Sequence, residues 1–149
     1  MPLSKRYIDE QDVDVPVDFD GLRALFVETY DQVVFTLVMG SATQGTVQSH
    51  SDLDLAIYAS RPLSLDERVS MIRHVSDLHQ GVRCDLGMLR LAEPVYRFEA
   101  LKGRLLFTRD QETWLRFYSV TCREYESQMF HYEKQRCYRI AEKVRPTNT

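Results

Sequence analysis

Hydrophobic positions along the chain change their period several times, and each change marks a predicted element. Between residues 19 and 30 apolar side chains recur every three or four positions, which predicts an amphipathic helix. Residues 33–39 form an almost unbroken apolar run of strand length, which predicts a strand buried on both faces and ended by Gly40. Residues 52–58 alternate in polarity and therefore predict a second strand with one apolar face.

The next segment carries clear helix-boundary signals. Ser64 and Glu67 form a capping-box pattern at the start of a helical period, and Gly81 follows its end. Residues 82–89 predict a third strand. The order of helix, strand, strand, helix and strand is typical of a mixed sheet with helices packed on it.

The last part of the chain predicts a short helix, a short strand and one long helix. These cover residues 95–101, 104–107 and about 110–143. The long helix carries an aromatic stripe, which favours packing against the domain and leaves a partner groove as the alternative. The stripe consists of Trp114, Phe117, Tyr118, Thr121, Cys122, Tyr125, Met129 and Tyr132.

We therefore predict an α/β (α+β) fold, with a mixed β-sheet, helices packed on it and a long C-terminal helix. The length of 149 residues suits one domain. Within it we expect a loosely ordered N-terminal segment (1–16), a core (17–109) and a helical extension (110–149) that packs on the core or on a partner.

Charge and cysteine content narrow the class of protein. A net charge of −3 makes a nucleic-acid-binding cation unexpected. Residues 1–31 carry eight acids and three bases, whereas residues 116–145 carry seven bases and four acids, which indicates a solvated helix face or a partner surface. The three cysteines lack metal-like spacing, and neither a secretion signal nor an apolar membrane span is visible, so we expect a cytoplasmic protein.

Two aspartates at the start of the second strand are the main candidates for chemistry. Asp52 and Asp54 are two residues apart, so on a strand they point the same way, with their positions roughly 6–7 Å apart. Like charges at this spacing repel unless a cation lies between them, and Mg²⁺ commonly takes one or two carboxylates. Taken alone, the pair would more simply be two solvated residues at a strand end.

The neighbouring segments favour metal binding by these aspartates over two solvated residues at a strand end. Gly40-Ser41 directly follows a buried strand, where free backbone N–H groups and a hydroxyl can hold phosphate oxygens, although Gly-Ser is also a common turn. Asp85 lies in the third strand in apolar surroundings, so it needs a metal, a hydrogen-bond donor or an exposed edge, and a salt bridge with Arg83 or Arg90 is the structural alternative. Three carboxylates beside a phosphate-binding turn match the needs of two-metal phosphoryl transfer.

This combination resembles the signature of the DNA polymerase β-like nucleotidyltransferase superfamily: Gly40-Ser41, a ten-residue gap, Asp52-x-Asp54, and then a distal strand aspartate, Asp85. The short chain is similar to the minimal nucleotidyltransferase (MNT) antitoxins of HEPN/MNT toxin–antitoxin pairs. The tail segments FEALKGRLLFTRD and WLRFYSVTCREYESQMFHYEKQRCYR are also similar to the tails of those antitoxins.

The resemblance implies a protein adenylyltransferase that uses ATP and Mg²⁺, with two ions expected. It would transfer AMP to a tyrosine of a cognate HEPN-domain RNase toxin and so neutralise it in a hetero-oligomer, without membrane or direct nucleic-acid binding. Gly40 and Ser41 would hold the triphosphate. Asp52, Asp54 and Asp85 would bind metal and form the catalytic set, with Asp85 also acting as base.

One departure from the family pattern concerns the phosphate loop, and two other functions stay open. Many relatives carry an arginine before the next glycine, whereas this chain has Ala42-Thr43-Gln44-Gly45, which puts the phosphate contacts of the loop in question. The alternatives are an antitoxin that neutralises by binding alone and a transferase for a small molecule such as an aminoglycoside. His50 is an alternative phosphate contact, while His74, His79 and His131 are expected at the surface.

Overall fold

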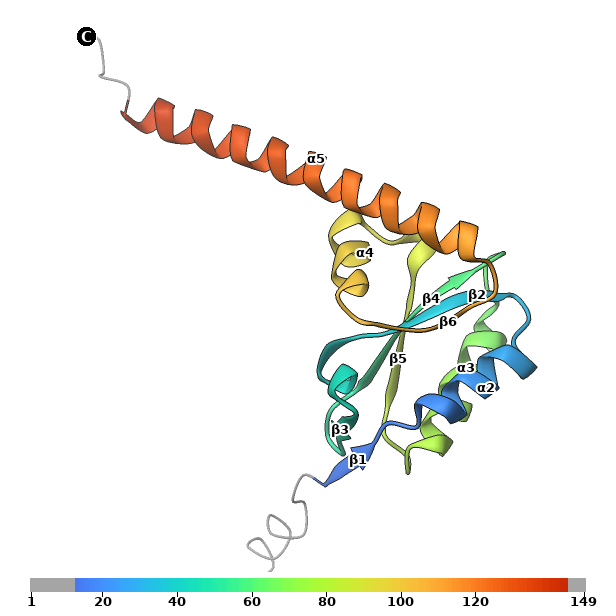
Figure 1. Cartoon of the computed structure of the whole chain (residues 1–149). Coiled ribbons are helices and arrows are strands. Elements are labelled where there is room, and N and C mark those ends of the chain that lie inside the picture. Colours follow the sequence, from blue (N-terminus) through green and yellow to red (C-terminus); the bar gives the residue numbers. More distant parts are fainter. Residues whose placement is uncertain (1–12, 145–149) are drawn as a thin grey trace, which may run out of the picture.

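The structure is a computed structural model that describes residues 13–144. Of the predicted N-terminal segment (1–16), residues 1–12 lie outside the described range. Its main body is a four-stranded sheet in the order β5-β4-β2-β6, with helices on both faces (Figure 1). The elements in chain order are β1 (Asp14–Pro16), α2 (Phe19–Thr29), β2 (Val33–Val38), the 3₁₀ helix η1 (Gly40–Gln44), β3 (Thr46–Gln48), β4 (Leu53–Ala59), α3 (Leu65–Leu78), β5 (Cys84–Met88), η2 (Leu89–Leu91), α4 (Pro94–Leu101), β6 (Arg104–Thr108) and α5 (Gln111–Val144).

The sheet is mixed, as the sequence predicts. β4 runs antiparallel to β2 and parallel to β5, and β6 pairs antiparallel with the other side of β2. The central position of β2 explains why its residues form a continuous apolar run, since a strand covered on both faces has no solvent side. The predicted fold class is confirmed.

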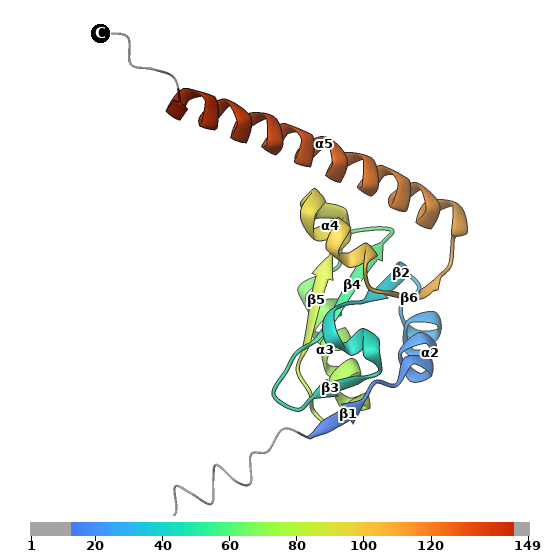
Figure 2. The same ribbon diagram turned by 60° about the vertical axis from the view of Figure 1, so that its left-hand side comes forward.

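Each face of the sheet has its own hydrophobic core. α2 and α3 cover one face, where Phe26, Leu55 and Met71 belong to one buried cluster. α4 and the first part of α5 cover the other face, where Phe35 and Phe117 belong to a second cluster. Figure 2 shows α4 between the sheet and α5. The alternation of β4 therefore divides its side chains between the two cores, and Asp54 falls on the α4 side with Ala56.

Local signals set the ends of α3 as predicted. The Ser64 hydroxyl accepts from the Glu67 N–H while the Glu67 carboxylate accepts from the Ser64 N–H, which completes the capping box. Gly81 has a φ of 80°, a left-handed conformation that glycine adopts without strain. The helix is thus defined at both ends by residues that the sequence analysis identified.

Two features of the fold differ from the sequence prediction. Residues 14–16, expected in a loosely ordered segment, form β1 and pair antiparallel with β3, whose three residues are too few to show a period. His79, expected at the surface, is only 1% exposed. Its Nε2 accepts the Asp18 N–H and its Nδ1 donates to the Val75 carbonyl, so it is a fully bonded structural residue that spacing alone does not identify.

The two halves of α5 have different surroundings. In the first half, Trp114 and Phe117 pack on Phe35, and Tyr125 stacks on Phe98 of α4 with ring centroids 3.7 Å apart. Residues 130–143 are exposed throughout, and the helix extends past the domain (Figure 1). Within the described residues, no helix has both the length and the apolar character needed to cross a membrane.

Candidate functional site

Asp54 and Asp85 lie side by side on adjacent strands. The parallel register of β4 and β5 pairs them directly, so their side chains leave the same face of the sheet. Asp85 is exposed because β5 is an edge strand, which corrects the expectation of an apolar environment. Neither salt bridge considered for Asp85 is formed, since Arg83 pairs with Asp52 and Arg90 donates to the carbonyls of Ala59 and Ser60.

Asp52 lies just before β4 and is turned toward a basic partner. Its Oδ1 is 3.2 Å from the Arg83 Nε, and both side chains are largely exposed. An exposed pair of this kind contributes little free energy, about 0–1 kcal/mol, so it can open at small cost. Asp52 is therefore near the other two carboxylates but directed to Arg83.

The electrostatics of Asp54 show that negative charge accumulates here without compensation. Burial raises the pKa of its carboxyl above the usual value, and the neighbouring charges of Asp85 and Asp52 raise this pKa further. A carboxylate with a structural salt bridge would show the opposite shift. The arrangement favours binding of a cation at this point.

A tight turn brings the backbone of Gly40 against this carboxylate. Gly40 has a φ of 67°, and a Cβ built on it would lie 3.5 Å from Asp54 Oδ2. The left-handed conformation favours glycine, and the absent side chain leaves the carboxylate face of the turn open. Ser41 follows at the exposed start of η1, and the Thr43 hydroxyl donates to the Gly40 carbonyl at 2.8 Å. The turn and the carboxylates thus belong to one site.

An open depression of about 340 Å³ connects this turn with the end of α4. Its lining includes Gly40, Thr43 and Asp54 on one side and Glu99 and Lys102 on the other. The Lys102 Nζ pairs with Glu99 Oε1 at 3.0 Å. Lys102 places a cation beside the loop that contains Gly40 and Thr43. Lys102 falls between the predicted short helix and short strand, and only the fold brings it to this site.

Tyr96 is a second residue that sequence analysis did not identify. Its hydroxyl fills the space that a Cβ on Gly87 would occupy, and Gly87 lies two residues beyond Asp85 on β5. Burial raises the pKa of Tyr96, and the charges of Asp85 and then Asp54 raise it further. The glycine in the strand was the available signal, since it often marks a close approach of another group.

The donor set fits a hard divalent cation, but the three carboxylates are not gathered around one point. Among the described residues, no three acidic, histidine or cysteine side chains are close enough to hold a metal ion. Asp54 and Asp85 share a face, whereas Asp52 is engaged by Arg83. Oxygen ligands with uncompensated negative charge are those that Mg²⁺ prefers.

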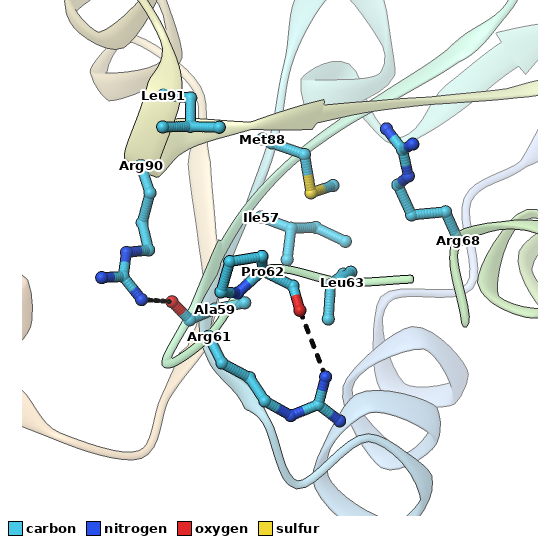
Figure 3. Close-up of a pocket in the computed structure, with 9 residues that line it drawn as sticks. All are labelled: Ile57, Ala59, Arg61, Pro62, Leu63, Arg68, Met88, Arg90 and Leu91. Carbon is cyan, nitrogen blue, oxygen red and sulfur yellow. Dashed lines mark hydrogen bonds between the residues drawn. The ribbon is translucent and has the colours of Figure 1, made fainter. Parts of the chain in front are cut away.

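A different pocket, of about 280 Å³, lies at the opposite ends of the same two strands. Arg61, Arg68 and Arg90 surround an apolar floor that includes Ile57 and Met88 (Figure 3). Arg61 pairs with Glu67, and Arg90 is held by backbone carbonyls. The carboxylates do not line this pocket, and we do not assign the chemistry to it.

Comparison with known proteins points to one family. A family model described as "Polymerase beta, Nucleotidyltransferase" matches residues 23–112. Curated proteins gave no match.

Solved structures with the same fold come from toxin–antitoxin complexes. A mutant MntA–HpeT complex gives a TM-score of 0.65 at 20% identity, covering 86% of this chain and 99% of the other. A toxin–antitoxin complex with AMP-PNP gives 0.63 at 22% identity, with 86% and 99% covered. A tri-AMPylated Shewanella oneidensis HEPN toxin in complex with its MNT antitoxin gives 0.59 at 19% identity, with 85% and 96% covered.

Proposed function

The chain belongs to the polymerase β nucleotidyltransferase family, and on this basis we propose that it is an antitoxin that transfers AMP from ATP to a tyrosine of a HEPN-domain toxin. Its reaction class, nucleotidyl transfer, follows from the family. The antitoxin role is supported by the shared fold with chains from complexes named as toxin–antitoxin pairs, one of which contains an AMPylated toxin. Modification of the toxin would neutralise its RNase activity.

One observation carries the chemical part of this proposal. Asp54 and Asp85 are paired across β4 and β5, and Gly40 lies against Asp54. These residues fall within the segment that matches the family. Paired carboxylates next to an open glycine turn provide metal ligands and phosphate donors in one place.

In the proposed reaction, different residues of this chain bind the phosphates, hold the metal and accept the proton. Gly40 and Ser41 offer backbone N–H groups and a hydroxyl to the triphosphate, and Lys102 adds a positive charge from the far side of the depression. Mg²⁺, held by Asp52, Asp54 and Asp85, would neutralise phosphate charge and make the acceptor hydroxyl more acidic. Asp85 lies exposed on the edge strand, where it can take the proton of an incoming tyrosine hydroxyl.

The projecting half of α5 is the surface that we assign to the partner protein. Phe130, Tyr132, Tyr138 and Ile140 are each more than half exposed, on a helix that extends past the domain. Exposed aromatic side chains are enriched at protein interfaces. Basic residues on the same stretch suit an acidic partner surface: Lys134, Arg136, Arg139 and Lys143.

The direct test is transfer of label from ATP. The protein is incubated with Mg²⁺, ATP labelled at the α-phosphate and the protein encoded by the adjacent gene. We expect label on a tyrosine of that neighbour and none with the Asp52→Asn/Asp54→Asn variant. Absence of label on the true neighbour would contradict the proposal.

A neutralisation assay separates modification from simple binding. The double variant keeps the volume of both side chains, so it should still bind the neighbour but no longer relieve its toxicity. If toxicity is relieved as well as by the wild type, neutralisation occurs by occlusion. Labelling of an aminoglycoside in place of the neighbour would instead support a small-molecule transferase.

A further inference from the structure

A tyrosine of the chain itself lies where an acceptor hydroxyl is needed. In the β4–β5 register the row Asp54–Asp85 is followed by the row Ala56–Gly87 on the same face. The step between these rows is roughly 6–7 Å. Because Ala56 and Gly87 are small, the phenol of Tyr96 enters this space, and its hydroxyl lies where the side chain of Gly87 would begin.

The helix that carries Tyr96 is held in place from several sides. Arg97 donates to the carbonyls of Leu89 and Arg90, and Phe98 stacks on Tyr125 of α5. Pro94 at the first helical position also restricts the start of α4. Tyr96 is therefore presented by a fixed element and not by a flexible loop.

The residue is also partly exposed, and its hydroxyl has no competing hydrogen bond within the described range. Tyr96 is 36% exposed. Among residues 13–144 no group forms a hydrogen bond with this hydroxyl, whereas the Tyr30 hydroxyl contacts both Ser70 and His74. A hydroxyl beside uncompensated carboxylates, with no structural bond of its own, is free to meet a phosphate group.

We propose that Tyr96 is an internal AMP acceptor, modified by the chain's own site when no partner tyrosine occupies it. The phenolic oxygen attacks the α-phosphorus of ATP, the bond from that phosphorus to the bridging oxygen breaks, and pyrophosphate leaves with the electron pair. The phenolic proton passes to Asp85 and then to water. This inference rests on the proposed transfer of AMP, and it adds a modification site on the antitoxin itself.

The fold distinguishes Tyr96 from the chain's other described tyrosines. Tyr58 leaves the same face as Asp54 but four residues further along β4, and it stacks on Phe35. Tyr118 is more exposed, at 47%, but it lies on α5 against Trp114. Tyr118→Phe is therefore a matched control, because it removes an exposed phenol that lies on a different element from the carboxylates.

The experiment uses the full chain alone, with Mg²⁺ and ATP labelled at the α-phosphate. We expect one AMP per chain by intact mass, with peptide mapping placing it on Tyr96. Tyr96→Phe and Asp54→Asn should each abolish the label, while Tyr118→Phe should keep it. Mapping on the wild type needs no variant, so the test stands even if a variant folds poorly.

A parallel reaction that contains the neighbouring gene product separates this inference from the proposed function. Label on the neighbour but never on the antitoxin would overturn the internal acceptor and leave the proposed function intact. Label on neither protein would overturn both. Label that maps to another tyrosine, or that persists in Tyr96→Phe, would also overturn the assignment to Tyr96.

Discussion

The parallel strands β4 and β5 carry charged residues at both ends, but the charged side chains at the two ends differ in whether they have bonding partners. At the end where the strands begin, Asp54 and Asp85 face each other, and burial and like charge raise the pKa of Asp54. At the end where they finish, Arg61 pairs with Glu67, and Arg90 donates to backbone carbonyls. At one end Asp54 and Asp85 form no ion pair within the described residues, and at the other end Arg61 and Arg90 are bonded within the protein.

This difference indicates which end of the two strands is the better candidate for catalysis. The arginine pocket has an apolar lining that includes Ile57, Leu63 and Met88 (Figure 3), but most of its cations already have partners. The carboxylate end is an open depression in which the pKa of Asp54 is raised by burial and by neighbouring like charges. A perturbed carboxylate in a depression is a typical sign of function.

The largest expected effect comes from neutralising the carboxylate end. Asp54→Asn should lower the rate of AMP transfer on the order of a thousand-fold. Charge stabilisation through a bound metal is worth several kcal/mol, and each ~1.36 kcal/mol is a factor of ten in rate. The measurement is the initial rate of label transfer from ATP to the neighbouring gene product.

Arg68→Ala is the control at the other end of the strands. It removes a charge that lines the arginine pocket and is remote from the carboxylates. We expect the transfer rate to stay within about twofold of the wild type, since surface substitutions away from a site have small effects. A loss as large as that of Asp54→Asn would show that the arginine pocket takes part in the reaction.

Lys102→Ala should have the next largest effect. Lys102 contributes the positive charge of the depression that also contains Gly40 and Asp54. Loss of one charge-assisted contact to phosphate should weaken ATP binding by about ten- to a hundredfold, because such contacts contribute about 1.5–3 kcal/mol. Calorimetric titration of the chain with ATP and Mg²⁺ measures this change.

Lys134→Ala is the matched control, since it removes the same side chain from the exposed part of α5. Its affinity for ATP should equal that of the wild type. Equal affinities of all three proteins would mean that Lys102 serves only its ion pair with Glu99.

The sequence was sufficient for most of the fold, because its signals there are local. The period of apolar residues fixed the type of each main strand and helix, and the Ser64–Glu67 pattern is realised as a capping box. β1 and β3 were missed because three residues are too few to show a period. His79 was misplaced because its two hydrogen bonds join segments that only the tertiary fold brings together.

The site was predictable only in part, because some of its residues are brought together only by the tertiary fold. Asp54 was identified because alternation tells which face a strand residue takes, and Asp85 because an acid in an apolar strand needs a partner. Only the structure shows that parallel pairing sets them side by side. Tyr96 and Lys102 lie on and after α4, whose position over the sheet depends on packing with α5. No spacing in the sequence places a helix over one particular pair of strands.

A smaller effect, on stability alone, is expected at the arginine end. Ser64→Ala removes the hydroxyl that accepts the Glu67 N–H at the start of α3. Loss of such a cap should lower the free energy of unfolding by about 1 kcal/mol. Chemical denaturation measures this, and the rate of AMP transfer should stay unchanged. A matching loss of activity would contradict the separation of the two ends.

The smallest and most diagnostic effect is the opposite pH dependence of the two ends in the absence of metal. Ion pairing with Arg61 and the cap lower the pKa of Glu67 to about 2. Its contribution to stability is therefore present above its ordinary pKa of about 4.3 and is lost as the pH falls from there toward 2. Glu67→Gln should thus lower the melting temperature at neutral pH and have progressively less effect in acid.

Asp54 should behave in the reverse way. Its pKa is raised in the folded chain, so the unfolded chain ionises first, and the charge costs stability as the pH rises above the ordinary value of about 3.9. Asp54→Asn should therefore raise the melting temperature at neutral pH, and the gain should disappear in acid. Added Mg²⁺ should stabilise the wild type but not this variant, because a ligand stabilises only the state that binds it. If Asp54→Asn instead lowers the melting temperature at neutral pH, the carboxylate serves the fold, and the contrast between the two strand ends does not hold.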